Sequence, residues 1–158
     1  VHIKSMEEVD FDFHARHLAK KKYYIYKVLR GERPEVFEHN YKYYFPKELD
    51  IKIMEKALME FVGKKDFRAF SSKHTDVTDF RRTVYEAYLT EEGNELWFHF
   101  VGRGFVYNML RIIVGTVLDV GIGKRQIDTI VTALETGDRN LRSKKAPASG
   151  LYLKEVYY

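Results

Sequence analysis

The stretch that decides the fold runs from residue 104 to residue 121 and reads GFVYNMLRIIVGTVLDVG. If it is wound as an α-helix, apolar side chains fall on every side, and such a helix is normally buried in a core. Arg111 lies in the middle of this stretch. A buried guanidinium is costly unless a carboxylate or a phosphate meets it. We therefore expect either a structural ion pair at Arg111 or a crevice in which Arg111 is used.

Strand patterns dominate the chain before this stretch. Residues 20–30 predict a strand, in which Tyr24, Tyr26 and Val28 face one way and Tyr23, Ile25 and Leu29 the other. A short strand around 41–45 and a pair of strands at 82–90 and 95–101, joined by the turn at 91–94, complete the set.

Two more helices are expected, one on each side of the apolar stretch. The first runs from Asp50, a plausible N-cap, to Gly63, a plausible C-cap, and the second runs over 125–135 and is closed by Gly137. A basic loop then leads to a last strand at 150–157. The pattern predicts an α+β fold with a largely antiparallel sheet flanked by helices.

The composition is that of one globular domain spanning residues 1–158, with 45% hydrophobic and 32% charged residues. The absence of cysteine excludes disulfides, a thiolate nucleophile and a zinc-thiolate site. No run of eighteen uncharged apolar residues occurs, and the first residues lack the profile of a signal peptide. We expect a soluble, cytoplasmic protein with no membrane association.

The net charge of +4 is modest, but the basic residues are clustered. They are either solvated surface or a surface that follows the phosphates of a nucleic acid, where the twelve tyrosines and eleven phenylalanines would offer stacking partners for unpaired bases. The clusters are Arg16, Lys20, Lys21 and Lys22; Arg81, Arg82 and Arg103; Lys124 and Arg125; and Arg139, Arg142, Lys144 and Lys145.

Four segments together resemble a known family. They are Phe13-His14-Ala15-Arg16 followed by Tyr24-Ile25-Tyr26, Asp66-Phe67-Arg68-Ala69-Phe70, the 104–115 part of the apolar stretch, and Ala146-Pro147 with Gly150-Leu151-Tyr152-Leu153. In order and spacing they are similar to the F-x-A-R…Y-x-Y, D-F-x-x-F, A-F-x-x-x-M-V-R-x-I-V-G and A-P-x-x-G-L-x-L segments of the tRNA pseudouridine synthase A family. The resemblance covers residue 10 to the C-terminus.

One family motif is missing from the chain. The nucleophilic aspartate of the family belongs to an R-T-D-A-G-V-H motif in a preceding domain, whereas Arg82-Thr83 is followed here by Val84. The resemblance therefore implies that these residues are the C-terminal domain of a two-part enzyme, and that they are inactive alone.

The resemblance also implies a chemistry. A flipped-out uridine loses its N-glycosidic bond, turns and re-attaches through C5, with an aspartate as nucleophile and no metal or organic cofactor. By motif position, Tyr24 provides the aromatic ring that holds the detached uracil, and Arg111 is the arginine that pairs with the aspartate. The substrate is implied to be the anticodon stem-loop of tRNA and the intact enzyme to be a homodimer.

We expect RNA or substrate contacts from residues near these motifs. Asn108 is included because it precedes Arg111 by about one helical turn and could reach the same crevice. The expected set is Tyr24, Arg16, Lys20, Lys22, Arg82, Arg103 and Asn108, with no metal ligand among them.

Two other functions remain open on the sequence. One is a non-catalytic RNA-binding module on a similar sheet, although the paired aromatics of a Gly-rich strand motif are not evident. The other is a pure assembly domain in which Arg111 forms a structural ion pair.

Overall fold

The computed structural model describes residues 2–3, 5–31, 37–72 and 77–158. Its elements follow one another as β1 (Lys21–Leu29), β2 (Tyr43–Tyr44), α1 (Ile51–Met59), β3 (Gly63–Asp66), β4 (Arg81–Glu92), β5 (Glu95–Gly102), α2 (Met109–Gly121), α3 (Ile127–Thr136) and β6 (Leu151–Tyr157). Two short 3-10 helices, Arg139–Leu141 and Ala148–Gly150, precede β6.

The strands form one six-stranded sheet in the order β2-β1-β5-β4-β3. β6 also pairs with β1, along residues 21–26 of β1. β2 pairs with Val28 and Leu29, the last two residues of β1. Only the short β1–β2 pairing is parallel among the described strands. The predicted α+β fold with a largely antiparallel sheet is confirmed.

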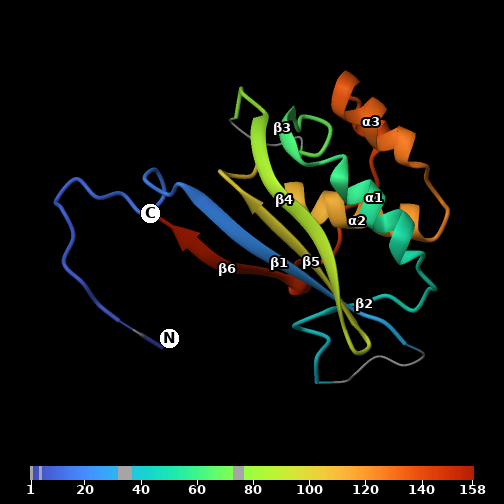
Figure 1. The fold of residues 1–158 in the computed structure, drawn as a ribbon, viewed down its shortest axis with the longest axis horizontal. Helices are drawn as coiled ribbons and strands as arrows, with labels where there is room; N and C mark the ends of the chain where they lie inside the picture. The colour runs from blue at the N-terminus through green and yellow to red at the C-terminus, as the bar shows by residue number, and fades with distance from the viewer. Residues whose placement is uncertain (1, 4, 32–36, 73–76) are drawn as a thin grey trace.

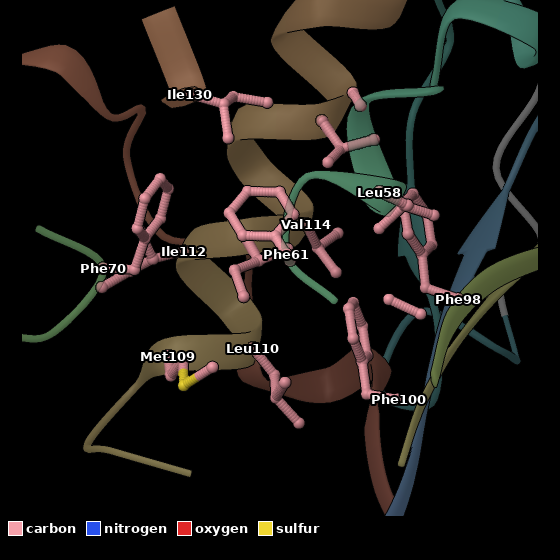
Figure 2. Close-up of a cluster of buried hydrophobic side chains, with 14 of the residues drawn as sticks. Leu58, Phe61, Phe70, Phe98, Phe100, Met109, Leu110, Ile112, Val114 and Ile130 are labelled. Carbon is pink, nitrogen blue, oxygen red and sulfur yellow. The ribbon is translucent and has the colours of Figure 1, made fainter. Parts of the chain in front are cut away.

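The helices cover one face of the sheet (Figure 1). The alternation of β1 and β5 directs Tyr26, Val28, Phe98 and Phe100 toward α2, as alternate residues of a strand point to the same face. Figure 2 shows Phe98 and Phe100 meeting side chains of α1 and α2 in this layer. Ten of the thirteen residues of α2 are buried, which confirms the expectation that this helix is buried in the core.

The apolar helix is shorter than the sequence suggested. It begins at Met109, because Asn108 adopts a left-handed conformation with φ 60° and ends the irregular connection from β5. Arg111 therefore lies in the first turn of α2, and the prediction that it sits in mid-helix was wrong. A side chain in the first turn lies beside the connection that precedes the helix, so Arg111 has access to groups outside the core.

The first predicted helix also ends early. α1 stops at Met59, and Gly63, expected to cap it, begins β3 with φ 104° and pairs with Val84. The strand was missed because Gly63–Asp66 carries charged residues in place of alternating apolar ones. The predicted caps at Asp50 and Gly137 are confirmed: the Asp50 carboxylate accepts from the Ile53 N–H at 3.1 Å, and Gly137 has φ 72°.

The opposite face of the sheet carries an aromatic cluster around His99 of β5. The imidazole is buried, stacks on Tyr88 with ring centroids 4.5 Å apart, and hydrogen-bonds the hydroxyls of Tyr23 at 2.7 Å and Thr90 at 2.8 Å. Burial lowers the pKa of His99, while Glu92 opposes that shift. Burial, followed by the Tyr88 hydroxyl, raises the pKa of Tyr23 to about 12.

None of the helices in the described ranges is long and apolar enough to cross a membrane.

Candidate functional site

The guanidinium of Arg111 is held by two groups from outside its own helix. Its Nε donates to the carbonyl oxygen of Ala146 at 2.8 Å, and one terminal nitrogen donates to the Asn108 side-chain oxygen at 3.1 Å. The backbone adds a third link, since the Ala146 N–H donates to the Arg111 carbonyl at 2.9 Å. The side chain is therefore fixed in orientation while it remains partly accessible.

Most of the hydrogen-bonding capacity of Arg111 is left over. A guanidinium has five N–H donors, and only two of them are used within the described part of the chain. No carboxylate of that part forms an ion pair with Arg111. The structural ion pair considered from the sequence is not formed there, and Asp119, two turns further on, pairs with Lys124. The remaining donors suit a carboxylate or phosphate.

Asn108 connects Arg111 to the loop before β4. Its side-chain oxygen accepts from Arg111, and its amide nitrogen donates to the Ser72 hydroxyl at 2.8 Å. The Ser72 N–H in turn donates to the Tyr107 carbonyl at 3.2 Å. Both ends of the amide are thus engaged with the protein, so this residue orients the guanidinium.

The loop that follows the 3-10 helix at Arg139–Leu141 packs directly on α2. The Ser143 N–H donates to the Thr116 hydroxyl at 3.1 Å, and a Cβ added at Gly115 would come within 2.1 Å of the Lys144 carbonyl oxygen. Arg125 clamps the same loop, donating to the Ser143 hydroxyl and to the carbonyls of Leu141 and Arg142. The carbonyl that orients Arg111 is therefore rigidly placed.

Tyr26 joins β1 to this loop. Its hydroxyl donates to the Pro147 carbonyl at 2.7 Å, next to the Ala146 carbonyl that accepts from Arg111. Burial raises the pKa of Tyr26, and the positive charge of Arg111 opposes that rise, since the two groups are neighbours. The family motif Tyr24-Ile25-Tyr26 thus reaches the surroundings of Arg111 through its second tyrosine.

Tyr24 lies two residues earlier on the same face of β1. Its ring is partly buried and meets Phe105 edge-to-face, with centroids 5.5 Å apart. Phe105 belongs to the connection that ends at Asn108, so Tyr24 contacts the segment that orients Arg111. Burial raises the pKa of Tyr24 above its usual value of 10.0. The hydroxyl is therefore protonated near neutral pH.

Three of the expected RNA contacts gather at one end of the sheet. Arg82 and Arg103 line a cleft of about 400 Å³, together with Lys64 and the exposed Asp79–Arg81 ion pair. Lys22 lies opposite Gly102, the residue before Arg103. Side-chain and backbone hydrogen bonds from Arg81 lower the pKa of Asp79 to about 2.

Arg16 and Lys20 lie in the segment before β1, and both are exposed. The Lys20 N–H donates to the Tyr157 carbonyl at 2.8 Å, so the C-terminal end of β6 holds this part of the segment. Within the described ranges, no hydrogen bond or ion pair links either residue to the groups that hold Arg111.

The sequence interpretation missed the groups that orient the site. Neither the Ala146 carbonyl nor Ser72 was assigned a role, and Arg125 was counted only as part of a basic cluster. A carbonyl oxygen has no sequence signal of its own, although Ala146-Pro147 was part of the family pattern. The described residues contain no group of three or more His, Cys, Asp or Glu placed to hold a metal ion.

Residues 57–158 match the profile of a protein family described as tRNA pseudouridine synthase. Similar proteins named tRNA pseudouridine synthase A occur in Geobacillus sp. strain WCH70, with 49% identity over 156 residues, and in Anoxybacillus flavithermus, with 48% identity over 156 residues. In both cases the match covers 99% of this chain and 63% of the relative. A protein of the same name from Lacticaseibacillus casei is 44% identical over 160 residues, which is all of this chain and 65% of the relative. The chain thus spans slightly less than two thirds of the length of these relatives.

Proposed function

The chain belongs to the tRNA pseudouridine synthase family, and on this basis we propose that it supplies one wall of an active site that isomerises uridine to pseudouridine in tRNA. The observation that carries this proposal is Arg111, whose guanidinium is oriented by Ala146 and Asn108 and keeps unused donors. Such a group is prepared to meet an anion.

The anion at Arg111 is the nucleophilic aspartate of the reaction. The family motif that carries this aspartate is not among the 158 residues, so in our proposal it comes from residues outside this chain. A planar guanidinium meets a carboxylate through two parallel hydrogen bonds, which keeps the carboxylate ionised and aims it at the sugar or base. The same guanidinium can also bind a backbone phosphate of the flipped nucleotide.

Tyr24 is the ring that holds the detached uracil. Its partly buried ring has a rigid edge-to-face support in Phe105, and stacking on a base is worth roughly 1–3 kcal/mol. The raised pKa keeps the phenol protonated, so the hydroxyl cannot remove the C5 proton as a phenolate at rest. In the proposed relay the phenol oxygen takes up the C5 proton while the phenol passes its own proton to a hydrogen-bonded water, so the side chain ends neutral.

The substrate in this proposal is the anticodon stem-loop of tRNA. The cleft with Arg82 and Arg103, the neighbouring Lys22, and the exposed Arg16 and Lys20 supply positive charge for RNA phosphates. The intact enzyme is a cytoplasmic homodimer in which the nucleophile-bearing part covers Arg111 and Tyr24. No metal or organic cofactor takes part.

The test uses the protein that carries this chain and unmodified tRNA labelled with tritium at C5 of uridine. Isomerisation replaces the C5–H bond with a bond to C1′, so tritium appears in water. We expect release by the wild type and a loss of about 10- to 150-fold in Arg111→Lys, because lysine cannot form the paired hydrogen bonds, worth roughly 1.5–3 kcal/mol.

Arg30→Lys is the matched control, since Arg30 forms an ion pair with Glu91 near the turn between β4 and β5. It should retain wild-type release. Unchanged release in Arg111→Lys would remove Arg111 from the chemistry. Tight tRNA binding with no tritium release by the wild type would favour the alternative of a non-catalytic RNA-binding module.

A further inference from the structure

A second positively charged depression lies beside Asn108. This groove has a volume of about 710 Å³ and is lined by Ser72, Tyr107, Asn108, Ile112, Arg142, Lys144 and Lys145. It is separate from the cleft that holds Arg82 and Arg103. Of its lining residues, only Asn108 was among the RNA contacts expected from the sequence.

The described lining of this groove carries positive charge and no carboxylate. Arg142, Lys144 and Lys145 form no ion pair with any residue in the described ranges. Among the described residues, the Arg142 side chain donates only to the Ser143 carbonyl, at 3.2 Å, and its buried Nε finds no acceptor there. Burial, followed by the charge of Arg139, lowers the pKa of Arg142. Three neighbouring cations that have no counter-charge in the described ranges form a site that an anion would stabilise.

The backbone that presents these cations is held firmly. Arg125 makes three hydrogen bonds to residues 141–143, and Lys144 lies against Gly115 of α2. At the other wall, Arg139 donates to the Ser71 carbonyl at 3.2 Å, which ties the loop before β4 to the same region. The groove is therefore preformed, and little ordering is needed on binding.

Two features of the groove identify the kind of anion. Tyr107 is 59% exposed and lines the groove, so an aromatic face is offered beside the cations. Cations with an exposed aromatic ring suit a single-stranded nucleic acid, whose phosphates meet the charges while a base stacks. Asn108 lines the groove and also orients Arg111, so a strand bound here lies next to that guanidinium.

We propose that the Tyr107–Arg142–Lys144–Lys145 groove binds the RNA backbone next to the uridine that is handled at Arg111, with two or more phosphates on the cations and one base on Tyr107. This inference rests on the proposed function for the identity of the RNA. It adds a phosphate-binding site beside Asn108.

The test measures tRNA binding by the protein that carries this chain as a function of salt. Lys144→Gln/Lys145→Gln should weaken binding and lower the slope of log K against log salt by about 2, one for each lost phosphate contact. Lys52→Gln/Lys56→Gln removes the same charge from exposed positions of α1 and should keep the wild-type slope. Tyr107→Ala should weaken binding by about 5- to 150-fold with an unchanged slope, since stacking is not ionic.

The outcomes separate this site from the proposed function. The proposal that the groove binds RNA is overturned if Lys144→Gln/Lys145→Gln keeps the wild-type slope of log K against log salt. It is also overturned if Lys52→Gln/Lys56→Gln lowers that slope by the same amount. Either result counts even if the wild type releases tritium. Absence of tritium release by the wild type overturns the proposed function, while the slopes still decide the groove. All four lysines are exposed, so thermal unfolding midpoints should stay at the wild-type value.

Discussion

Arg111 and Ala146 are joined by reciprocal hydrogen bonds. The Arg111 Nε donates to the Ala146 carbonyl at 2.8 Å, and the Ala146 N–H donates to the Arg111 carbonyl at 2.9 Å. The two residues are 35 positions apart, so the pair fixes the loop before β6 against the first turn of α2. The orientation of the guanidinium therefore depends on the loop as much as on the helix.

Asn108→Gly removes the hydrogen bond between Arg111 and Asn108 and leaves the hydrogen bonds between Arg111 and Ala146 in place. Glycine tolerates φ 60° without strain, so the backbone should keep its shape while the side-chain hydrogen bonds to Arg111 and Ser72 are lost. We expect about a tenfold fall in kcat of the protein that carries this chain, from a hydrogen bond worth roughly 1.4 kcal/mol, with little change in KM. Ser72→Ala is the comparison, since it removes the acceptor of the Asn108 amide but leaves the hydrogen bond from Arg111 to Asn108, and it should retain more activity. Equal kcat in wild type and Asn108→Gly would contradict a positioning role.

The loop contact at Gly115 predicts a loss of stability. In Gly115→Ala the new Cβ would lie 2.1 Å from the Lys144 carbonyl oxygen, so the loop or the helix must move. We expect the free energy of unfolding to fall by about 1–3 kcal/mol, despite the better helix propensity of alanine. Urea unfolding of the 158-residue chain measures this, with Gly104→Ala as control because nothing lies within 4 Å of its added Cβ. If Gly115→Ala were as stable as the control, the loop at Lys144 would be able to move away from the new Cβ without a cost in free energy.

The buried His99 predicts a pH dependence of stability. Burial holds its pKa below the ordinary 6.5, so the unfolded chain binds more protons than the folded one between the two pKa values. This contribution is fully present above pH 6.5 and is lost as the pH falls through the folded pKa, with a slope of at most about 1.4 kcal/mol per pH unit. The groups facing the ring are Tyr23, Tyr88 and Thr90, and Glu92 lies near enough to oppose the shift.

Urea unfolding at pH 8, 7, 6 and 5 measures this contribution. His99→Gln removes the titrating group and should flatten the decline between pH 7 and 5, whereas the exposed His14→Gln should leave it unchanged. Parallel curves for wild type and His99→Gln would show that His99 is not the source.

Much of the fold could be predicted from residue patterns because the strands and helices obey their periods. The alternation in β1 and β5 and the caps at Asp50 and Gly137 were identified correctly. β3 and the start of α2 were not identified correctly. β3 carries charged residues in place of an apolar alternation, and the left-handed Asn108 interrupts the apolar run in which the helix was expected. β3 depends on tertiary context, because it is formed by its pairing with β4.

The candidate site divides in the same way. The family pattern selected Tyr24 and Arg111 by residue type, but not the groups that orient them. The Ala146 carbonyl is invisible in a sequence, and Ser72 and Phe105 reach the site only through the path of the chain. Whether Tyr24 and Arg111 act on one nucleotide stays a prediction.

Substitutions of Tyr24 separate stacking from proton relay. Tyr24→Phe keeps the ring on Phe105 and removes the hydroxyl, whereas Tyr24→Leu removes both. If the hydroxyl relays the C5 proton, Tyr24→Phe should cleave the glycosidic bond and stall before tritium release, and Tyr24→Leu should also lose the roughly 1–3 kcal/mol of stacking. Single-turnover assays on C5-tritiated tRNA follow release, while gel shifts follow binding. Tyr85→Phe, at an exposed strand position, is the control. Wild-type release by both Tyr24 variants would make Tyr24 an ordinary strand residue, because neither ring nor hydroxyl would then be needed.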